Sequence, residues 1–571
     1  MSSLGSALQI GASGLLNYQT AIEVTGNNLA NVATSGYTRQ TVNLAPAGTQ
    51  QVAQGAFVGL GVQLQSISSA VDEALNGRVN ASISDQSAAS ARQGVLPQVQ
   101  SAEGELSTSG NDVSTQLSNF FNAWSQLADT PQDSSQRSMV IQQGQTLAGT
   151  LQNLAGTLGE QQTQLNQTIA STVNTVNGLL GQLQTVNGQL AQMGAGAQNA
   201  NNLVDQRDQL VAQLAQYVDV STRELPTGAV DVFVGSTPLM LNGQSRGLAL
   251  TQTTVDGQAQ TQVVVAADGT PLQAGSGELG ALITANSQDL GGAIQAVNNF
   301  AGQLIDQVNL VYSQGQGLTG FSSVTSTNAV ADATKALNDP AAGLAFTPQN
   351  GSFQVSVTQA STGQTVTSTI NVTLDGVNPA SQTTLSSLEA SLNAVSGIQA
   401  SVSADGHLRI SGATSDDTIS FGKDSSGALA ALGVNTFFSG TSASTIAVNS
   451  VVSATPGLLA AGQNNNTGDN SNALAVAALN TQALPALGGM SLPGLWGQHV
   501  EDYASRLAQT TNQVAAAAVV NQSLTAQQQS VSGVNVDTET INLMAFERAY
   551  EASARFLSTV DEITKTLLGL S

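Results

Sequence analysis

The chain has 571 residues and a formal net charge of −23, because it holds 14 lysines and arginines but 37 aspartates and glutamates. Binding to nucleic acid or to an anionic membrane depends on clustered cations, yet no basic run follows the first cation, Arg39. We therefore expect no nucleic acid and no membrane as a partner. The absence of cysteine excludes disulfides and thiolate sites, and two histidines exclude a site with several histidine ligands. We expect no cofactor and no metal.

The surface that this composition predicts is polar but weakly charged. Charged residues make up 9% of the chain and aromatic residues 4%, whereas hydrophobic residues reach 41%. Such a surface suits subunits that pack against copies of themselves, since little charge has to be desolvated at each contact. No stretch approaches ~18 consecutive apolar residues, and the N-terminus lacks the basic region of a cleavable signal. If the protein leaves the cell, we expect it to use another export route.

An amphipathic helix is predicted from about residue 4 to residue 33. Steps of four and three residues keep large apolar side chains on one side of it, as coiled-coil packing requires. We expect this seam to mediate assembly, and it consists of Leu4, Leu8, Leu15, Tyr18, Ile22, Leu29 and Val32, with Gly11 and Thr25 in the remaining positions. Gly36 is expected to end the helix, because glycine readily adopts the left-handed conformation that closes a last turn.

The C-terminal end of the chain shows the same arrangement. Asp537 is expected to cap a helix whose first turn holds Thr538 and Glu539. Its predicted seam consists of Leu543, Phe546, Tyr550, Leu557, Val560 and Leu567. Neither terminal helix has an apolar partner in its own neighbourhood of the sequence. We therefore expect the two ends to pair with each other or with other subunits.

The region between the two ends alternates between two periodicities. Helical spacing predicts helices at about 75–217, 279–312 and 495–530, with an apolar seam that runs from Leu147 to Leu190. Alternating residues predict strands within 229–268 and 350–422. The expected fold class is α+β multidomain, with long coiled-coil-forming terminal and middle helices and an inserted β-rich domain. We assign 1–56 and 531–571 to a terminal helical assembly domain, 57–344 and 446–530 to a helical middle domain with β-hairpins at about 218–272, and 345–445 to a β-rich outer domain.

Two segments at the ends of the chain carry a family signature, NNLANVATSGYTRQ at 27–40 and SGVNVDTETINLMAFERAYEASARFLSTVDEITKTLLGL at 532–570, with its AY-ASAR core around Tyr550, Ala552 and Arg555. They resemble the signature segments of the bacterial flagellar rod, hook and hook-associated axial proteins. Inside the chain, LAALGVNTFFSGTSASTIAVN at 429–449 resembles the hook-associated members of this family. The residues that carry the resemblance are Asn27, Asn28, Asn31, Thr34, Gly36, Tyr37, Asn435, Phe437 and Phe438. One departure is Glu547-Arg548, where relatives more often carry amides.

The resemblance implies a structural adaptor rather than an enzyme. It would be secreted by the flagellar type III apparatus and would polymerise between the hook and the filament, with its terminal helices inside and its β-rich domain outside. The implied partners are copies of itself in a helical ring, hook protein, hook-associated protein 3, and a cytoplasmic export chaperone at the C-terminal helix. The alternatives are that the chain is itself a hook protein or a hook-associated protein 3, or that it is a secreted coiled-coil adhesin.

Three short patterns formally match catalytic or nucleotide-binding motifs. Gly243-Gln244-Ser245-Arg246-Gly247 matches a nucleophile elbow, but a strand rather than a helix is predicted after it. Two GxGxxG matches start at Gly275 and Gly315, and neither directly joins a strand to a helix, as a dinucleotide site requires. We interpret all three as turns or helix ends and expect no catalytic residue.

Overall fold

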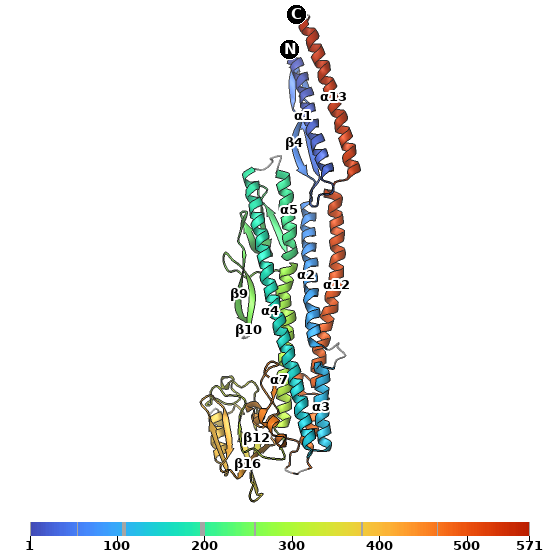
Figure 1. Ribbon diagram of the computed structural model, residues 1–571. Helices are drawn as coiled ribbons and strands as arrows, with labels where there is room; N and C mark the ends of the chain where they lie inside the picture. The colour runs from blue at the N-terminus through green and yellow to red at the C-terminus, as the bar shows by residue number, and fades with distance from the viewer. Residues whose placement is uncertain are drawn as a thin grey trace. The chain divides into compact units, whose positions relative to one another are not determined.

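The computed structural model describes residues 2–53, 55–104, 110–193, 200–255, 258–378, 381–464, 466 and 468–569 (Figure 1). The chain divides into two compact units. The first comprises Met1–Gly94, Leu165–Ala285 and Gln509–Ser571, and the second comprises Val95–Gln164 and Asn286–Ala508. Long helices combine with small antiparallel sheets in an α+β architecture, which confirms the predicted fold class. The segments predicted at 229–268 and 345–445, and the C-terminal helix, each include a few positions outside the described residues.

The first unit contains both terminal helices and three groups of strands. Its elements are α1 (Ser2–Ala30), β1 (Gln40–Pro46), β2 (Thr49–Ala53), β3 (Ala56–Gly59), β4 (Val62–Ser69), α5 (Ala200–Tyr217), β5 (Val220–Glu224), β6 (Val230–Val234), β7 (Thr237–Leu241), β8 (Gln244–Ser245), β9 (Leu248–Val255), β10 (Gln258–Val265), α6 (Gly277–Thr284) and α13 (Val536–Gly569). β1 pairs with β4 and β2 with β3 in one long hairpin, while β5 to β8 form a sheet in chain order. The helices α2 (Glu73–Glu103), α4 (Ser134–Met193) and α12 (Leu492–Ser532), and the π-helix η1 (Ala285–Leu290), contribute residues to both units.

The second unit combines helices with a β-rich part. Its elements are α3 (Val113–Asp129), α7 (Gly291–Tyr312), β11 (Ser323–Thr325), η2 (Pro340–Ala342), β12 (Gly351–Gln359), β13 (Thr365–Val372), α8 (Leu385–Asn393), β14 (Ile398–Val402), β15 (Leu408–Gly412), β16 (Asp417–Gly422), α9 (Ala428–Leu432), β17 (Phe438–Ser439), β18 (Ala447–Val448), α10 (Ser450–Ala454), η4 (Pro456–Leu458), α11 (Ser471–Ala478) and η5 (Pro485–Leu487). The two main sheets have the strand orders β13-β12-β16 and β11-β15-β14.

The apolar seam of α4 is buried along its length, as its sequence predicts. Leu151, Ile169 and Leu180 have no exposed surface. At Ile169 two consecutive steps of four residues interrupt the heptad spacing, and the seam stays buried there because a short phase shift only unwinds a helix contact locally. This helix therefore supplies core residues to both units.

The β-rich part has its own apolar core. Phe321, Phe353 and Ile410 belong to one buried cluster that draws residues from 321 to 458. Phe321 and Ile419 exchange two backbone hydrogen bonds, from Phe321 N to Ile419 O (2.7 Å) and from Ile419 N to Phe321 O (2.8 Å). The chain therefore enters and leaves the two sheets at neighbouring points, as an inserted domain requires.

Candidate assembly surface at the paired ends of the chain

The two ends of the chain pair with each other. Helices α1 and α13 run side by side in the first unit (Figure 1). They approach closely at Gly11 and Gly14 of α1. A Cβ atom on Gly11 would lie 2.8 Å from Leu557 Cδ1, and one on Gly14 would lie 2.7 Å from Ser553 Oγ. Glycine is thus needed at both positions for close packing rather than for its freedom of φ.

The predicted seam of α1 lies at the edge of this contact. Gly11 and Thr25 are buried, and the large seam residues Leu4, Leu15, Tyr18, Ile22 and Leu29 are half-buried. Leu8 and Val32 are exposed. The most buried side of α1 is rotated toward small residues such as Ala21, because the helix also packs against β1 and β4. The assembly role of the seam stays a prediction.

The seam of α13 is divided in the same way. Val560 is buried, and Leu543, Phe546 and Leu557 are half-buried. Tyr550 and Leu567 are exposed. Asn535 rather than Asp537 caps this helix, since its Oδ1 accepts a hydrogen bond from Thr538 N at 3.1 Å. The expectation for Asp537 was wrong because the helix starts at Val536, which places Asp537 in the first turn.

Asn28 of the N-terminal signature joins the two ends of the chain. Its buried Nδ2 donates to Gln40 O at 2.8 Å and to Glu539 Oε2 of α13 at 3.0 Å. Its Oδ1 accepts from Gln40 N at 2.9 Å and from Tyr37 Oη at 2.8 Å. We call these four residues, Asn28, Tyr37, Gln40 and Glu539, the Asn28 junction. One side chain thereby fixes α1, the start of β1 and the first turn of α13.

Tyr37 keeps its proton in this environment. Burial, and then the negative charges of Asp205 and Glu539, raise the pKa of Tyr37 to about 12. The phenol therefore stays a hydrogen-bond donor to Asn28 at neutral pH. Asp205 also accepts a hydrogen bond from Thr38 N at 3.3 Å, and its own pKa is raised mainly by burial.

The other N-terminal signature residues build the turn that follows α1. Asn31 Nδ2 donates to Asn27 Oδ1 at 2.6 Å, and Thr34 Oγ1 donates to Asn31 Oδ1 at 3.1 Å. Gly36 has φ +76° and lies against the side chain of Gln209. The α-helix ends at Ala30, earlier than predicted, and Gly36 closes the turns that follow it.

The internal signature residues lie in the core of the second unit. Phe437 and Phe438 are buried in an aromatic cluster with Phe120, Phe121, Trp124 and Tyr312. Asn309 Oδ1 accepts from the backbone N–H groups of both phenylalanines, at 3.0 and 2.9 Å. Asn435 has φ +51° and donates to Gly315 O at 3.0 Å. These contacts indicate a structural role for the segment in the second unit.

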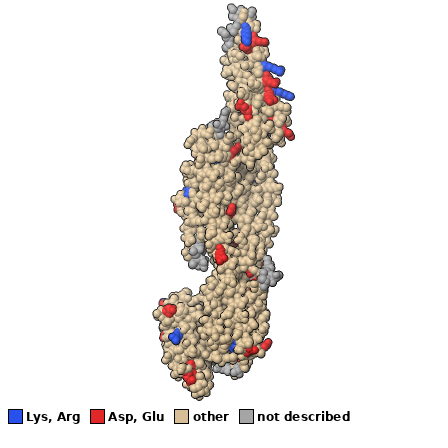
Figure 2. All heavy atoms as spheres, viewed as in Figure 1, with Lys and Arg blue, Asp and Glu red and all other residues tan. Residues whose placement is uncertain are grey.

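A second apolar stripe on α13 is uncovered, and the sequence analysis missed it. Ile541, Phe556 and Ile563 are exposed and share one side of the helix with Leu567. Figure 2 shows charged side chains gathered along the end of the molecule that α13 occupies. The exposed charged residues of α13 include Glu547, Arg548, Glu551, Arg555 and Lys565, of which Arg548 lies beside Ile541 at the border of the stripe. The helical spacing of Ile541, Phe556 and Ile563 was the signal that could have revealed the stripe.

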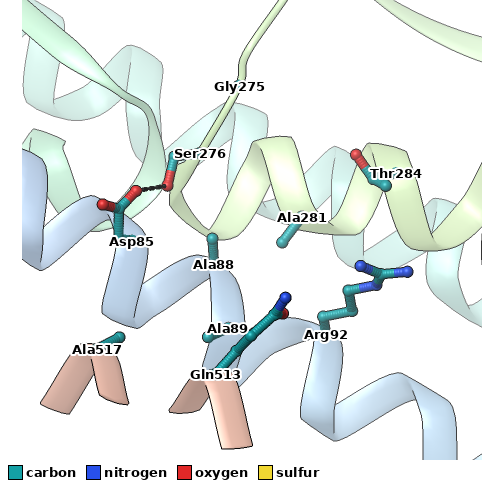
Figure 3. Close-up of a pocket in the computed structure, with 10 residues that line it drawn as sticks. All are labelled: Asp85, Ala88, Ala89, Arg92, Gly275, Ser276, Ala281, Thr284, Gln513 and Ala517. Carbon is teal, nitrogen blue, oxygen red and sulfur yellow. Dashed lines mark hydrogen bonds between the residues drawn. The ribbon is translucent and has the colours of Figure 1, made fainter. Parts of the chain in front are cut away.

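A hollow of about 290 Å³ lies between α2, α6 and α12 in the first unit (Figure 3). Alanines form much of its wall, and Ser276 Oγ donates to Asp85 Oδ1 at 2.8 Å. The residues that line it include no histidine, so the Ser276–Asp85 pair has no imidazole beside it in the hollow.

The catalytic and nucleotide-binding patterns fall in turns and at helix ends. Ser245 lies at the end of the short strand β8, and β9 follows it instead of a helix. Gly277 opens α6 with φ +80°, and the backbone of Tyr217 fills the space beside its Cα. Gly315 follows α7 and faces Asn472. In the described part of the chain, no helix is long and apolar enough to cross a bilayer.

Comparisons with known proteins match both ends of the chain and a helical region between them. The helical-domain model of the flagellar hook-associated protein FlgK matches residues 99–329. The flagella basal body rod protein model matches residues 8–38, and the C-terminal model of the rod proteins FlgE, FlgF and FlgG matches residues 527–570. The paired ends are therefore those of a flagellar axial protein.

Among curated proteins, flagellar hook-associated protein 1 of Escherichia coli is 25% identical over 99% of this chain and all of its own length. The Salmonella typhimurium protein of the same name is 26% identical with the same coverage. The solved structure of the flagellar hook junction protein FlgK from Burkholderia pseudomallei shares the fold, with a TM-score of 0.50 at 18% identity over 80% of this chain and all of that one. Along nearly its whole length the chain is therefore similar to flagellar hook-associated protein 1.

We predict that the Asn28→Ala variant weakens the joint between α1 and α13. The substitution removes four hydrogen bonds and leaves buried backbone and carboxylate groups unpaired, which costs about 2–4 kcal/mol. Hydrogen exchange of the first turns of α13 measures the loss. Asn27→Ala is the matched control, because Asn27 is exposed and its side chain bonds only Asn31 among the described contacts. Equal effects of the two substitutions would contradict a joint at Asn28.

We also predict that the Gly14→Leu variant separates α1 from α13. A larger side chain there collides with Ser553, so exchange protection should fall in both helices. Gly26→Leu tests the same substitution on the same helix, where a Cβ atom meets nothing within 4 Å. It should leave protection unchanged or raise it slightly, since leucine has the higher helix propensity. Intact protection in Gly14→Leu would show that the close approach does not hold the helices together.

Proposed function

We propose that the chain is a structural adaptor that polymerises at the distal end of the flagellar hook and joins the hook to the filament. The observation that carries this proposal is the pair formed by the two terminal signatures. The pair is held together by the Asn28 junction, and apolar residues of both helices stay uncovered. Apolar surface of this kind is typical of subunits that complete their packing in an assembly. The protein acts at the hook–filament junction after export from the cell.

The partners follow from this position in the flagellum. Copies of the chain associate in a short helical ring, hook protein lies on one side of it, and hook-associated protein 3 lies on the other. The exposed apolar residues of α13 support a cytoplasmic chaperone that covers this helix before export. In the ring, the terminal helices form the inner layer, the middle helices the next, and the β-rich domain the outer surface. The protein performs no catalysis.

A null strain tests this function. Cells that lack the protein are expected to build hooks of normal length but to release flagellin as monomer, because nothing connects the filament to the hook. Electron microscopy of the hooks and immunoblotting of the culture medium measure the two effects, and the wild-type gene restores both. Filaments of normal length on the null strain would contradict the proposal.

The β-rich domain is expected to be dispensable for the junction. Gln349 N donates to Ser426 O at 2.9 Å, so a short Gly/Ser bridge in place of 350–425 spans neighbouring points of the chain. Loop-closure entropy changes slowly with length, so the bridge itself should cost little. Swimming and filament length in the complemented null strain measure the effect.

The deletion can fail for two reasons that export distinguishes. A shortened protein that is exported normally but leaves cells without filaments would show that the domain supplies essential subunit contacts. A shortened protein that stays in the cell would indicate misfolding. In that case a variant with only the β12–β13 turn residues 360–364 replaced would test the outer surface alone.

A further inference from the structure

The hairpin that follows α1 carries no charge. Residues 40–69 contain no Asp, Glu, Lys, Arg or His, although the whole chain has a net charge of −23. This segment comprises the β1–β4 pair and its continuation, the β2–β3 pair. We call it the uncharged hairpin. Natural sheets usually protect their open edges with charged residues, which prevent pairing with another molecule. This hairpin lacks that protection.

The uncharged hairpin also lacks a core of its own. Among the described side chains from Thr41 to Ser69, none is buried. Its base is attached to α1, where Asn17 Nδ2 donates to Val62 O at 2.6 Å and Gly61 lies against Ser13. Two-stranded hairpins are only marginally stable without a covered face. A further surface is therefore needed to cover this hairpin.

The tip of the hairpin is apolar. Phe57 is 63% exposed and Val58 is 42% exposed, both on β3. A large aromatic side chain at the end of a projecting hairpin is typical of an anchor that enters a hollow on a partner.

The apolar stripe of α13 (Ile541, Phe556, Ile563 and Leu567) offers a complementary surface. All four side chains are exposed, between 43% and 63%. A shallow hollow along the helix is lined by Thr559, Glu562, Ile563, Thr566 and Leu567. The stripe is thus indented near Ile563, where Ile563 and Leu567 give an aromatic side chain apolar contacts beside the polar Glu562 and two threonines.

Among the described residues of one chain, neither the tip of the hairpin nor the stripe is covered. The base of the hairpin packs on α1, and the stripe of α13 is exposed in the same unit. A contact between two copies can satisfy both surfaces, since each copy presents one hairpin and one stripe. Such a head-to-tail contact propagates into a ring or a helical array. The hairpin brings no charge to the contact, so it adds no like-charge repulsion between copies that each carry a charge of −23.

We infer that the uncharged hairpin of one copy lies along the apolar stripe of α13 in the next copy, with Phe57 in the hollow beside Ile563. This inference rests on the proposed function, because it names the surfaces through which the junction polymerises. The partner is a second copy of this chain.

The absence of cysteine makes this contact directly testable. A variant with Phe57→Cys and Ile563→Cys holds two thiols that different copies bring together in assembled junctions. Treatment with a short bismaleimide should give a ladder of dimers and larger species on a denaturing gel. Phe57→Cys with Lys565→Cys is the matched control, because Lys565 is exposed and lies two residues from Ile563, on the opposite side of α13. This control should give at most a tenth of the cross-linked protein that the test pair gives.

Each outcome decides the inference. A ladder in the control as strong as in the test pair would overturn it. Dimers from Phe57→Cys alone would also overturn it, because they would show that the hairpins of two copies meet each other. No cross-link in junctions that electron microscopy shows to be intact would also overturn it, while leaving the proposed function in place. If every cysteine variant loses the junctions while the cysteine-free protein keeps them, cross-linking has no assembled junction to report on. The incorporation of Phe57→Asp into junctions then decides the inference.

Phe57→Asp is compared with Val377→Asp, which adds the same charge at an 81% exposed site in the β-rich domain. The inference requires that the hairpin variant be exported with an unchanged melting temperature yet enter junctions at least tenfold less than the Val377 variant. Equal incorporation of the two variants would overturn it.

Discussion

The close contact between α1 and α13 organises the functional end of this protein. Gly11 and Gly14 allow the two helices to approach until their side chains interlock with Ser553 and Leu557. The Asn28 junction then fixes the relative position of the helices with four hydrogen bonds from one buried amide. A buried amide that is fully paired specifies geometry strongly, because any displaced arrangement leaves polar groups unsatisfied.

Only part of the apolar surface of the terminal pair is used inside one chain. Val24 and Val560 are buried, while Leu16, Phe556 and Ile563 are exposed. A monomer with this surface would be prone to association. The low charge of α1, in which Glu23 is the single charged residue, removes electrostatic protection on that helix. These properties agree with a subunit that completes its packing in a polymer.

The second unit shows a different use of signature residues. Asn309 binds the backbone at Phe437 and Phe438, and both rings pack with Trp124 and Tyr312. A family signature can therefore mark a core that must be built in one way, as well as a surface that binds a partner. The β-rich part is attached to this core at Phe321 and Ile419, where the chain enters and leaves at neighbouring points.

The sequence by itself determined the long helices and the strands within 229–268 and 350–422, but not the β1–β4 hairpin. The seam from Leu147 to Leu190 predicted a buried helix because its spacing depends only on helical geometry. The two terminal signatures indicated that the ends of the chain act together.

Only the tertiary structure decided which side of each terminal helix is buried. The large seam residues of α1 lie at the edge of the contact, because α13 and the β1–β4 pair occupy adjacent sides of the helix and small residues fit between them. The link from Asn28 to Glu539 joins residues 511 positions apart. Local propensity carries no information about such a distance, since both side chains would be solvated and unpaired until the fold brings them together.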